Sequence, residues 1–170
     1  MSRQVFVYSQ KDFDSYIKSK NLDENNIEDD TTEAFISIIG TPECNSFYLE
    51  EPDAAHIIER DHNNWINLEF DDISRDLVWK GHKFKAITQE QADKIFNFIE
   101  SNVGKDFIIH CRAGHSRSFA VGKFLVNFYR YTLKTPDWNT PNSAVYGNLS
   151  HAYYQKYKPF LNDQSEGTEK

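Results

Sequence analysis

The chain has 170 residues, a length typical of one domain with a sizeable hydrophobic core. Nineteen basic and 26 acidic residues give a formal net charge of −7, which argues against nucleic acid as a partner. No apolar run approaches the ~20 residues that cross a bilayer, so no membrane partner is expected. Two cysteines are too few for a disulfide scaffold or a four-cysteine zinc site, and free thiols fit a reducing cytoplasm.

The sequence is expected to form a single domain over residues 1–162, followed by a disordered polar tail over residues 163–170. We find no internal repeat and no composition shift that would mark a second domain. Residues 1–5 lack the apolar segment of a signal peptide, so secretion is not expected.

The first third of the chain predicts two strands and a helix. Residues 5–8 read as a short strand, and Ser9 is placed to cap a helix with Phe13, Tyr16 and Ile17 on one face. Residues 21–32 are polar and acidic, as in a solvated loop. Residues 34–39 are almost continuously apolar and end at Gly40, a pattern typical of a strand buried on both faces in a parallel sheet.

Residues 41–64 are expected to be irregular, because Pro42 and Pro52 interrupt regular structure. Cys44 lies in this segment, and we interpret it as a bystander. A reversible disulfide with Cys111 would need the two thiols to be neighbours, and the sequence does not place them together. The alternating pattern of residues 65–70 then predicts another strand.

Carboxylates follow that strand at once. Asp71 and Asp72 stand where ligands bind in α/β sheets, outside the carboxyl end of a strand, and Asp76 lies slightly further on. The segment 74–87 has two interpretations. It is either a mobile lid or an ordered surface loop with Trp79 and Phe84 docked in the core.

The remaining elements complete an α/β pattern. Thr88 and Gln91 have the spacing of a capping box and predict a helix that stops near Gly104. Residues 107–109 predict a central strand, and an amphipathic helix follows Arg117. A last helix near residues 145–153 is expected to pack on the sheet. We therefore expect an α/β fold with a central, mostly parallel sheet of about four to five strands flanked by helices.

The turn between the central strand and its helix carries the chemistry. Backbone N–H groups and the positive end of a helix converge above such a turn, which suits an anion. Cys111 begins this turn, and thiolates are stabilised by these donors and by a nearby cation. Arg117 can bind two oxygens of one oxyanion, Ser118 can donate to the thiolate, and Gly114 permits a tight turn.

The segment His110-Cys111-Arg112-Ala113-Gly114-His115-Ser116-Arg117-Ser118 resembles the signature loop of the protein tyrosine phosphatase superfamily. The likeness extends weakly over residues 34–154 and is nearest to small dual-specificity and bacterial phosphatase-like proteins, which often carry a pair like Pro141-Asn142 before the last helix. It implies the cysteine phosphatase fold and hydrolysis of phosphomonoesters through a cysteinyl-phosphate, without a cofactor.

The resemblance also implies residue roles. Cys111 would be the nucleophile, assisted by Arg117 and Ser118, and the loop residues Arg112, Ala113, Gly114, His115 and Ser116 would bind the phosphoryl group. The general acid of the superfamily lies on a loop before the cysteine, so Asp72 is the first choice, Asp71 the second and Asp76 the third. The implied ligands are a phosphorylated protein or small phosphomonoester, and a phosphate or sulfate ion.

Two other functions are compatible with this loop. A binding module would hold phosphorylated ligands without turnover, although such modules usually lack the cysteine, the arginine or the acid. A rhodanese-like sulfurtransferase also uses a Cys-Arg loop, usually one residue shorter. The side chain of His110 would steady the loop or pack within the strand, and the two roles are not exclusive. The other histidines show no ligand spacing, so no metal site is predicted.

Overall fold

The computed structural model describes residues 3–47, 55–135 and 139–163. In these residues five strands form one parallel sheet in the order β3-β2-β6-β1-β7. The strands are β1 (Gln4–Tyr8), β2 (Glu33–Ile39), β3 (Trp65–Glu69), β6 (Asp106–His110) and β7 (Thr132–Leu133). The expected α/β class with a central parallel sheet is therefore confirmed. Strand β7 was not anticipated, because it consists of only two residues.

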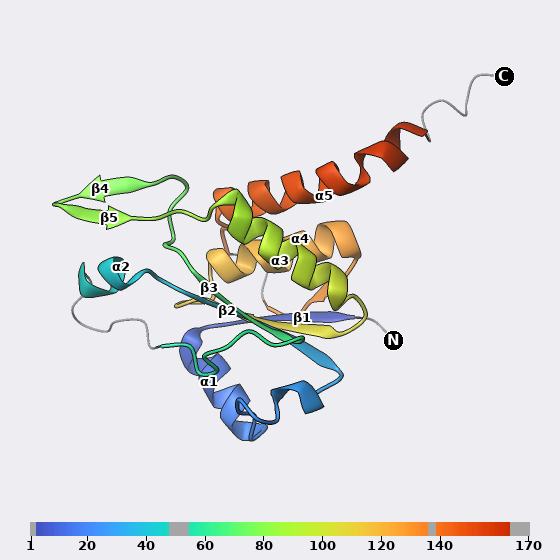
Figure 1. Ribbon diagram of the computed structural model, residues 1–170, viewed down its shortest axis with the longest axis horizontal. Coiled ribbons are helices and arrows are strands. Elements are labelled where there is room, and N and C mark those ends of the chain that lie inside the picture. The colour runs from blue at the N-terminus through green and yellow to red at the C-terminus, as the bar shows by residue number, and fades with distance from the viewer. Residues whose placement is uncertain (1–2, 48–54, 136–138, 164–170) are drawn as a thin grey trace.

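Helices cover both faces of the sheet (Figure 1). Helix α1 (Gln10–Ser19) lies on one face, whereas α3 (Gln89–Ser101), α4 (Arg117–Tyr129) and α5 (Ser143–Asp163) lie on the other. The expectation that the last helix packs on the sheet was wrong. Helix α5 packs on α3 and α4, because those two helices already cover the strands on that side. Only Asp163 of the expected tail is described, as the final residue of α5, and residues 164–170 lie outside the described ranges.

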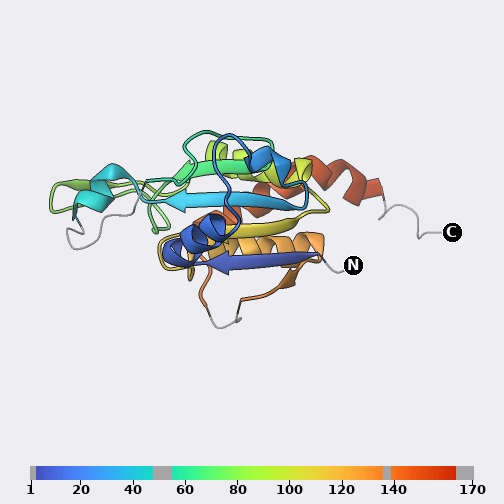
Figure 2. The ribbon, with the colours of Figure 1, turned by 90° about the horizontal axis from the view of Figure 1, so that it is seen from below.

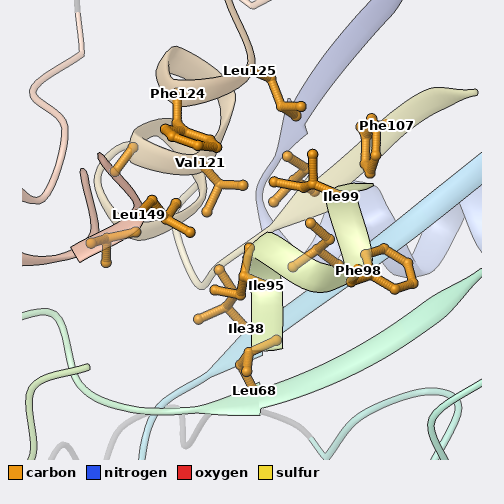
Figure 3. Packing of buried hydrophobic residues seen from close by; sticks show 14 of the residues in the cluster. Ile38, Leu68, Ile95, Phe98, Ile99, Phe107, Val121, Phe124, Leu125 and Leu149 are labelled. Atoms are coloured by element: carbon orange, nitrogen blue, oxygen red, sulfur yellow. The ribbon is translucent and has the colours of Figure 1, made fainter. Parts of the chain in front are cut away.

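The larger hydrophobic core fills the space between the sheet and the three helices on that face. Figure 3 shows side chains from all three layers converging, with Ile38 and Leu68 from the sheet below Ile95 of α3, and Val121 of α4 close to Leu149 of α5. A smaller core lies under α1 and includes Phe13, Ile17, Phe35, Trp65 and Ile108. Because β2 and β6 contribute to both cores, their apolar runs are continuous rather than alternating.

The predicted caps are formed. The Ser9 side chain accepts a hydrogen bond from the backbone N–H of Asp12 at the start of α1. At α3, the Thr88 hydroxyl accepts from the N–H of Gln91, and the Gln91 side chain accepts from the N–H of Thr88. These reciprocal bonds satisfy donors that would otherwise be orphaned at the helix start.

Regular structure occurs both in the segment expected to be irregular and in the segment interpreted as either a mobile lid or an ordered loop. Residues 42–47 form the short helix α2 (Pro42–Phe47), where proline occupies the tolerated first position. Residues 77–84 form a hairpin of β4 (Leu77–Trp79) and β5 (His82–Phe84), which turns at Lys80 and Gly81 with φ values of 49° and 81°. The interpretation as an ordered loop placed Phe84 and Trp79 in the core; Phe84 is buried, whereas Trp79 is 54% exposed, so that interpretation was wrong for Trp79.

All five parallel strands point toward the same end of the molecule. Figure 2 shows the arrowheads of β1 and β2 directed toward the end at which α2 and the hairpin lie. The carboxyl end of the central strand β6, which leads into Cys111, opens at this edge. Within the described ranges, no helix is both long enough and apolar enough to cross a lipid bilayer.

Candidate active site

The loop between β6 and α4 is held from behind by the N-terminal strand and helix. Gly114 adopts a φ of 75°, and a Cβ atom there would lie only 2.7–2.8 Å from backbone atoms of Tyr8 and Ser9. A glycine is therefore required both by the left-handed backbone and by this close approach. The carbonyl of Arg112 accepts a hydrogen bond from the N–H of Gln10 at 3.1 Å, which fixes the loop to the start of α1.

Cys111 lies at the floor of this loop, directly after the central strand. Its side chain is 2% exposed, and its Sγ accepts a hydrogen bond from the Ser118 hydroxyl at 3.0 Å. Ser118 is fully buried in the first turn of α4, so its hydroxyl is held in one place. The sulfur thus sits next to a hydroxyl donor and close to the N-terminus of α4, where the helix dipole is positive.

Arg117 is buried beside the cysteine, with 5% of its surface exposed. Its Nη1 donates a hydrogen bond to the Phe70 carbonyl at 2.8 Å, which anchors the guanidinium to the end of β3. Its Nε is buried and has no hydrogen-bond partner among the described residues. An unpaired buried donor on a charged group is costly, and an anion bound at this point would satisfy it.

Asp72 accepts hydrogen bonds from two donors, one in the loop and one directly before α5. The Ser116 hydroxyl donates to Asp72 Oδ1 at 2.7 Å, and the Asn142 side-chain amide donates to the same oxygen at 2.8 Å. The side-chain oxygen Oδ1 of Asn142 accepts from the N–H groups of Ala144 and Val145 and so caps α5. Within the described part of the chain, Oδ2 of Asp72 accepts no hydrogen bond, since both donors reach Oδ1.

The other two candidate acids are occupied elsewhere. Asp71 is 1% exposed, and its two oxygens accept hydrogen bonds from the N–H and hydroxyl of Thr41 and from the N–H of Lys85. Asp76 accepts from the N–H of Ala86 and pairs with the Lys85 ammonium, and the Ala86 bond is the main cause of its lowered pKa. Both carboxylates stabilise the segment around the hairpin, and of the three Asp72 is the one bonded to the loop.

A chain of hydrogen bonds supports the loop from inside the sheet. His110 Nδ1 donates to the Cys111 carbonyl at 3.2 Å, its Nε2 lies 2.7 Å from Ser37 Oγ, and Ser37 Oγ lies 2.7 Å from His56 Nδ1. Because a carbonyl only accepts, His110 Nε2 must accept from Ser37, and Ser37 must accept from His56. Burial lowers the pKa of His110 to about 3 and that of His56 to about 4, so both rings are neutral near pH 7.

His110 therefore fulfils both of its predicted roles. It bonds the loop backbone, and its ring also packs against Phe13 with centroids 4.2 Å apart. Its neighbour on β2 is Ser37, which lies opposite His110 in the parallel register. The hydrogen bonds of His110 therefore hold the Cys111 carbonyl in a fixed position relative to β2.

A pocket of about 250 Å³ opens above the loop. Its walls come from the loop, the end of β2, α2, the segment after β3, and β5. The lining residues are Gly40, Cys44, Asp71, Asp72, Ile73, Phe84, Cys111, Arg112, Ala113, His115, Ser116 and Arg117. Of the predicted phosphate-binding loop, Gly114 does not line the pocket, because it packs backward against Tyr8. Cys44 and Cys111, which the sequence did not place together, line the same pocket.

Sequence reasoning missed three polar residues around the loop. Asn142 had a signal, since an asparagine directly before a helix suggests an N-cap, but its bond to Asp72 has no local signature. Ser37 had a weaker signal as the one hydroxyl in an apolar strand. His56 had none, because its contact with Ser37 is made by a segment without regular structure.

In the described ranges, no cluster of three or more histidine, cysteine, aspartate or glutamate side chains is arranged to hold a metal ion. No protein-family model, no curated protein and no solved structure matches the chain. Its chemistry is therefore inferred from its own residues.

Proposed function

We propose that the protein is a cysteine-dependent phosphatase that hydrolyses phosphomonoesters. Its class is that of the phosphotyrosine or dual-specificity protein phosphatases. The observation that carries this proposal is the grouping of Cys111, Arg117 and Asp72 around one pocket. Ser118 donates to the Cys111 sulfur from below, and the buried Arg117 Nε lacks a partner in the described chain. These groups supply a nucleophile, an anion site and a proton donor.

The first step forms a sulfur–phosphorus bond. The Cys111 thiolate attacks phosphorus in line with the ester oxygen, and the phosphorus–oxygen bond breaks as its electron pair moves to that oxygen. Asp72 in its protonated form donates a proton from Oδ2 to the leaving oxygen, so that the alcohol departs neutral. The Arg117 guanidinium and the loop N–H groups stabilise the charge that spreads over the equatorial oxygens.

The second step releases phosphate. A water molecule attacks the cysteinyl-phosphate, the Asp72 carboxylate takes a proton from that water, and the sulfur–phosphorus bond breaks to return the thiolate. Ser118 assists here because its hydroxyl bond to Sγ stabilises the departing thiolate. The ester and water are thereby converted to alcohol and inorganic phosphate, and Asp72 is protonated again for the next cycle.

Hydrolysis of p-nitrophenyl phosphate by the purified protein tests this proposal. We expect the Cys111→Ser variant to lose at least about 10³-fold in kcat/KM, and we expect EDTA to leave the parent rate unchanged. The exposed Val103→Ser variant serves as a control for handling and folding. Full activity of Cys111→Ser would contradict the proposal, and so would sulfur transfer from thiosulfate to cyanide without phosphate release.

A further inference from the structure

The hairpin of β4 and β5 presents apolar side chains to solvent beside the pocket. Leu77, Val78 and Trp79 are 46%, 65% and 54% exposed, although they are consecutive residues of one strand. Single exposed apolar residues are ordinary, but three in succession on a projecting ribbon indicate a surface that is covered in use. Figure 1 shows the hairpin extending away from the sheet, with α2 on the β5 side and no other helix or strand of the described residues along β4.

The outer edge of β4 also has unused backbone groups. The N–H of Lys83 in β5 donates to the Glu43 side chain of α2 rather than to β4. Val78 lies opposite Lys83 in the hairpin. Because the Lys83 N–H points away from β4, the two residues form a non-hydrogen-bonded pair, in which the N–H and C=O groups of both residues point away from the partner strand. The N–H of Val78 therefore points outward from the open edge of β4, where an extended chain can add as a further strand.

The charge around this edge is opposite to that of the whole protein. Four basic residues and one acidic residue lie between positions 74 and 86, whereas the chain carries a net charge of −7. The ammonium groups of Lys80 and Lys83 form no ion pair among the described residues, although Glu43 accepts from the Lys83 backbone N–H, and the Lys80 ammonium lies 6.0 Å from the centre of the Trp79 ring. A cationic patch on an acidic protein selects acidic partners.

The position of the apolar groups favours a polypeptide over a lipid surface. The two residues at the tip of the hairpin are Lys80 and Gly81, whereas the apolar residues run along β4 from Leu77 to Trp79, with side chains on both faces of the ribbon. A ribbon that inserts into a bilayer would carry its apolar residues at the tip, whereas a neighbouring strand contacts the side. The pocket is close, because Phe84 of β5 and Ile73, four residues before β4, both line it.

From these observations we infer that the β4 edge is the docking site of the substrate polypeptide. The segment next to the phosphorylated residue adds to β4 as an extended strand, its apolar side chains cover Leu77, Val78 and Trp79, and its acidic side chains face Lys80 and Lys83. This inference rests on the proposed phosphatase function and identifies its substrate class as phosphorylated polypeptides with apolar and acidic residues beside the phosphorylated one.

The test compares a peptide with a small substrate. The peptide has alternating glutamate and valine on both sides of a phosphotyrosine, and p-nitrophenyl phosphate serves as the small substrate because it is too short to reach β4. We expect Leu77→Ser/Trp79→Ser and Lys80→Glu/Lys83→Glu to lower kcat/KM for the peptide by about tenfold, as for loss of an interface anchor, with little change for p-nitrophenyl phosphate. A peptide with lysine in place of glutamate should be a poorer substrate of the parent.

Val78→Pro isolates the backbone contribution. Proline removes the outward N–H of Val78 but no hydrogen bond to β5, so the hairpin is retained while strand addition is weakened. Val103→Ser removes another exposed apolar side chain, one that precedes β6 at the end of that strand opposite to Cys111, and should leave both substrates unaffected. Thermal unfolding of each variant establishes that it is folded.

The outcomes separate this inference from the proposed function. Equal losses for both substrates, or no loss for the peptide, would overturn the docking site. The parent is also sedimented with phosphatidylserine vesicles. If the parent binds the vesicles, the hairpin variants do not, and the peptide kinetics are unchanged in the variants, then the hairpin contacts a lipid surface and the docking site is overturned. If the parent hydrolyses neither substrate, the proposed function fails. In that case, peptide affinity measured by fluorescence anisotropy tests whether the β4 edge binds the peptide. Equal affinities of the parent and the hairpin variants would overturn the docking site.

Discussion

Asn142 donates a hydrogen bond to Asp72 Oδ1 at 2.8 Å, although 70 positions separate the two residues in the chain. Its own side-chain oxygen accepts from the first N–H groups of α5, so one amide both caps that helix and orients the carboxylate. The Asn142 backbone N–H donates to the Ser116 carbonyl at 3.1 Å, and Ser116 is the second donor to Asp72. The start of α5, the acid and the loop therefore form one hydrogen-bonded unit.

Replacing Asn142 by aspartate separates these two functions. The new carboxylate would still accept from the helix N–H groups, so thermal stability should change little, but the side chain would lose its donor to Asp72 and place a second negative charge beside it. We expect kcat/KM to fall about tenfold and the basic limb of its pH profile to move to higher pH, because protonated Asp72 is favoured. Asn142→Ala should in addition lose about 1 kcal/mol of stability with the cap. An unchanged pH profile in Asn142→Asp would contradict the assigned role.

The three aspartates should respond differently to substitution by asparagine. Asp72→Asn should slow phenyl phosphate, which has a poor leaving group, by about 10²–10⁴-fold, and should slow p-nitrophenyl phosphate less. Asp71→Asn should chiefly lower the melting temperature, because its new amide would face the N–H donors of Thr41 and Lys85. Asp76→Asn should affect leaving-group dependence least. If Asp76→Asn shows the strongest leaving-group dependence, the assignment of the acid moves to that residue.

Gly114→Ala should disable the loop through its backbone. The φ of 75° alone costs a non-glycine residue about 1–2 kcal/mol, and the new methyl group would also overlap the backbone of Tyr8 and Ser9. We expect a lower melting temperature together with weaker inhibition by inorganic phosphate. Gly81→Ala at the hairpin turn is the matched control, because it has a similar φ of 81° with nothing within 4 Å. Equal phosphate inhibition in the two variants would show that the Gly114 contact is dispensable.

The buried histidines should make stability depend on pH. In the unfolded chain a histidine titrates near its ordinary pKa of about 6.5, whereas burial holds the pKa of His110 near 3 and that of His56 near 4. The unfolded state therefore binds more protons as the pH falls from 6.5, and stability is lost across that window. His110 alone gives a slope of up to about 1.4 kcal/mol per pH unit.

Urea unfolding at several pH values between 7 and 4 measures this slope. His56→Asn, which retains a hydrogen-bonding side chain near Ser37, should reduce the slope relative to the parent. His151→Asn changes a histidine on the exposed surface of α5 and should not. Identical slopes for the parent and His56→Asn would contradict a neutral, buried His56 in the folded protein.

Local signals in the sequence were enough to predict most of the fold. The capping box at Thr88, the apolar run of β2 and the turn after β6 each depend on residues within a few positions of one another. The two-residue strand β7 is too short to produce a pattern. The packing of α5 on α3 and α4 could not be predicted from hydrophobic periodicity, because periodicity identifies the buried face of a helix but not the element that packs against it.

Only the part of the site that is contiguous in the sequence could be predicted. Cys111, Arg117 and Ser118 lie within eight positions, and their types and spacing indicated an anion-binding loop. Asp72 was identified only as one of three aspartates, since its distinction from Asp71 depends on contacts with Thr41 and Lys85 on one side and with Ser116 and Asn142 on the other. Such contacts are set by the tertiary fold.

The central claim is that Cys111 becomes covalently phosphorylated during turnover. The Asp72→Asn variant is suited to a direct measurement, because loss of the general base should slow hydrolysis of the intermediate more than its formation from p-nitrophenyl phosphate. After mixing and rapid acid quench, peptide mass spectrometry should find one phosphoryl group on Cys111, together with a burst of about one p-nitrophenol per protein molecule. Rapid turnover with no burst and an unmodified Cys111 would contradict the account.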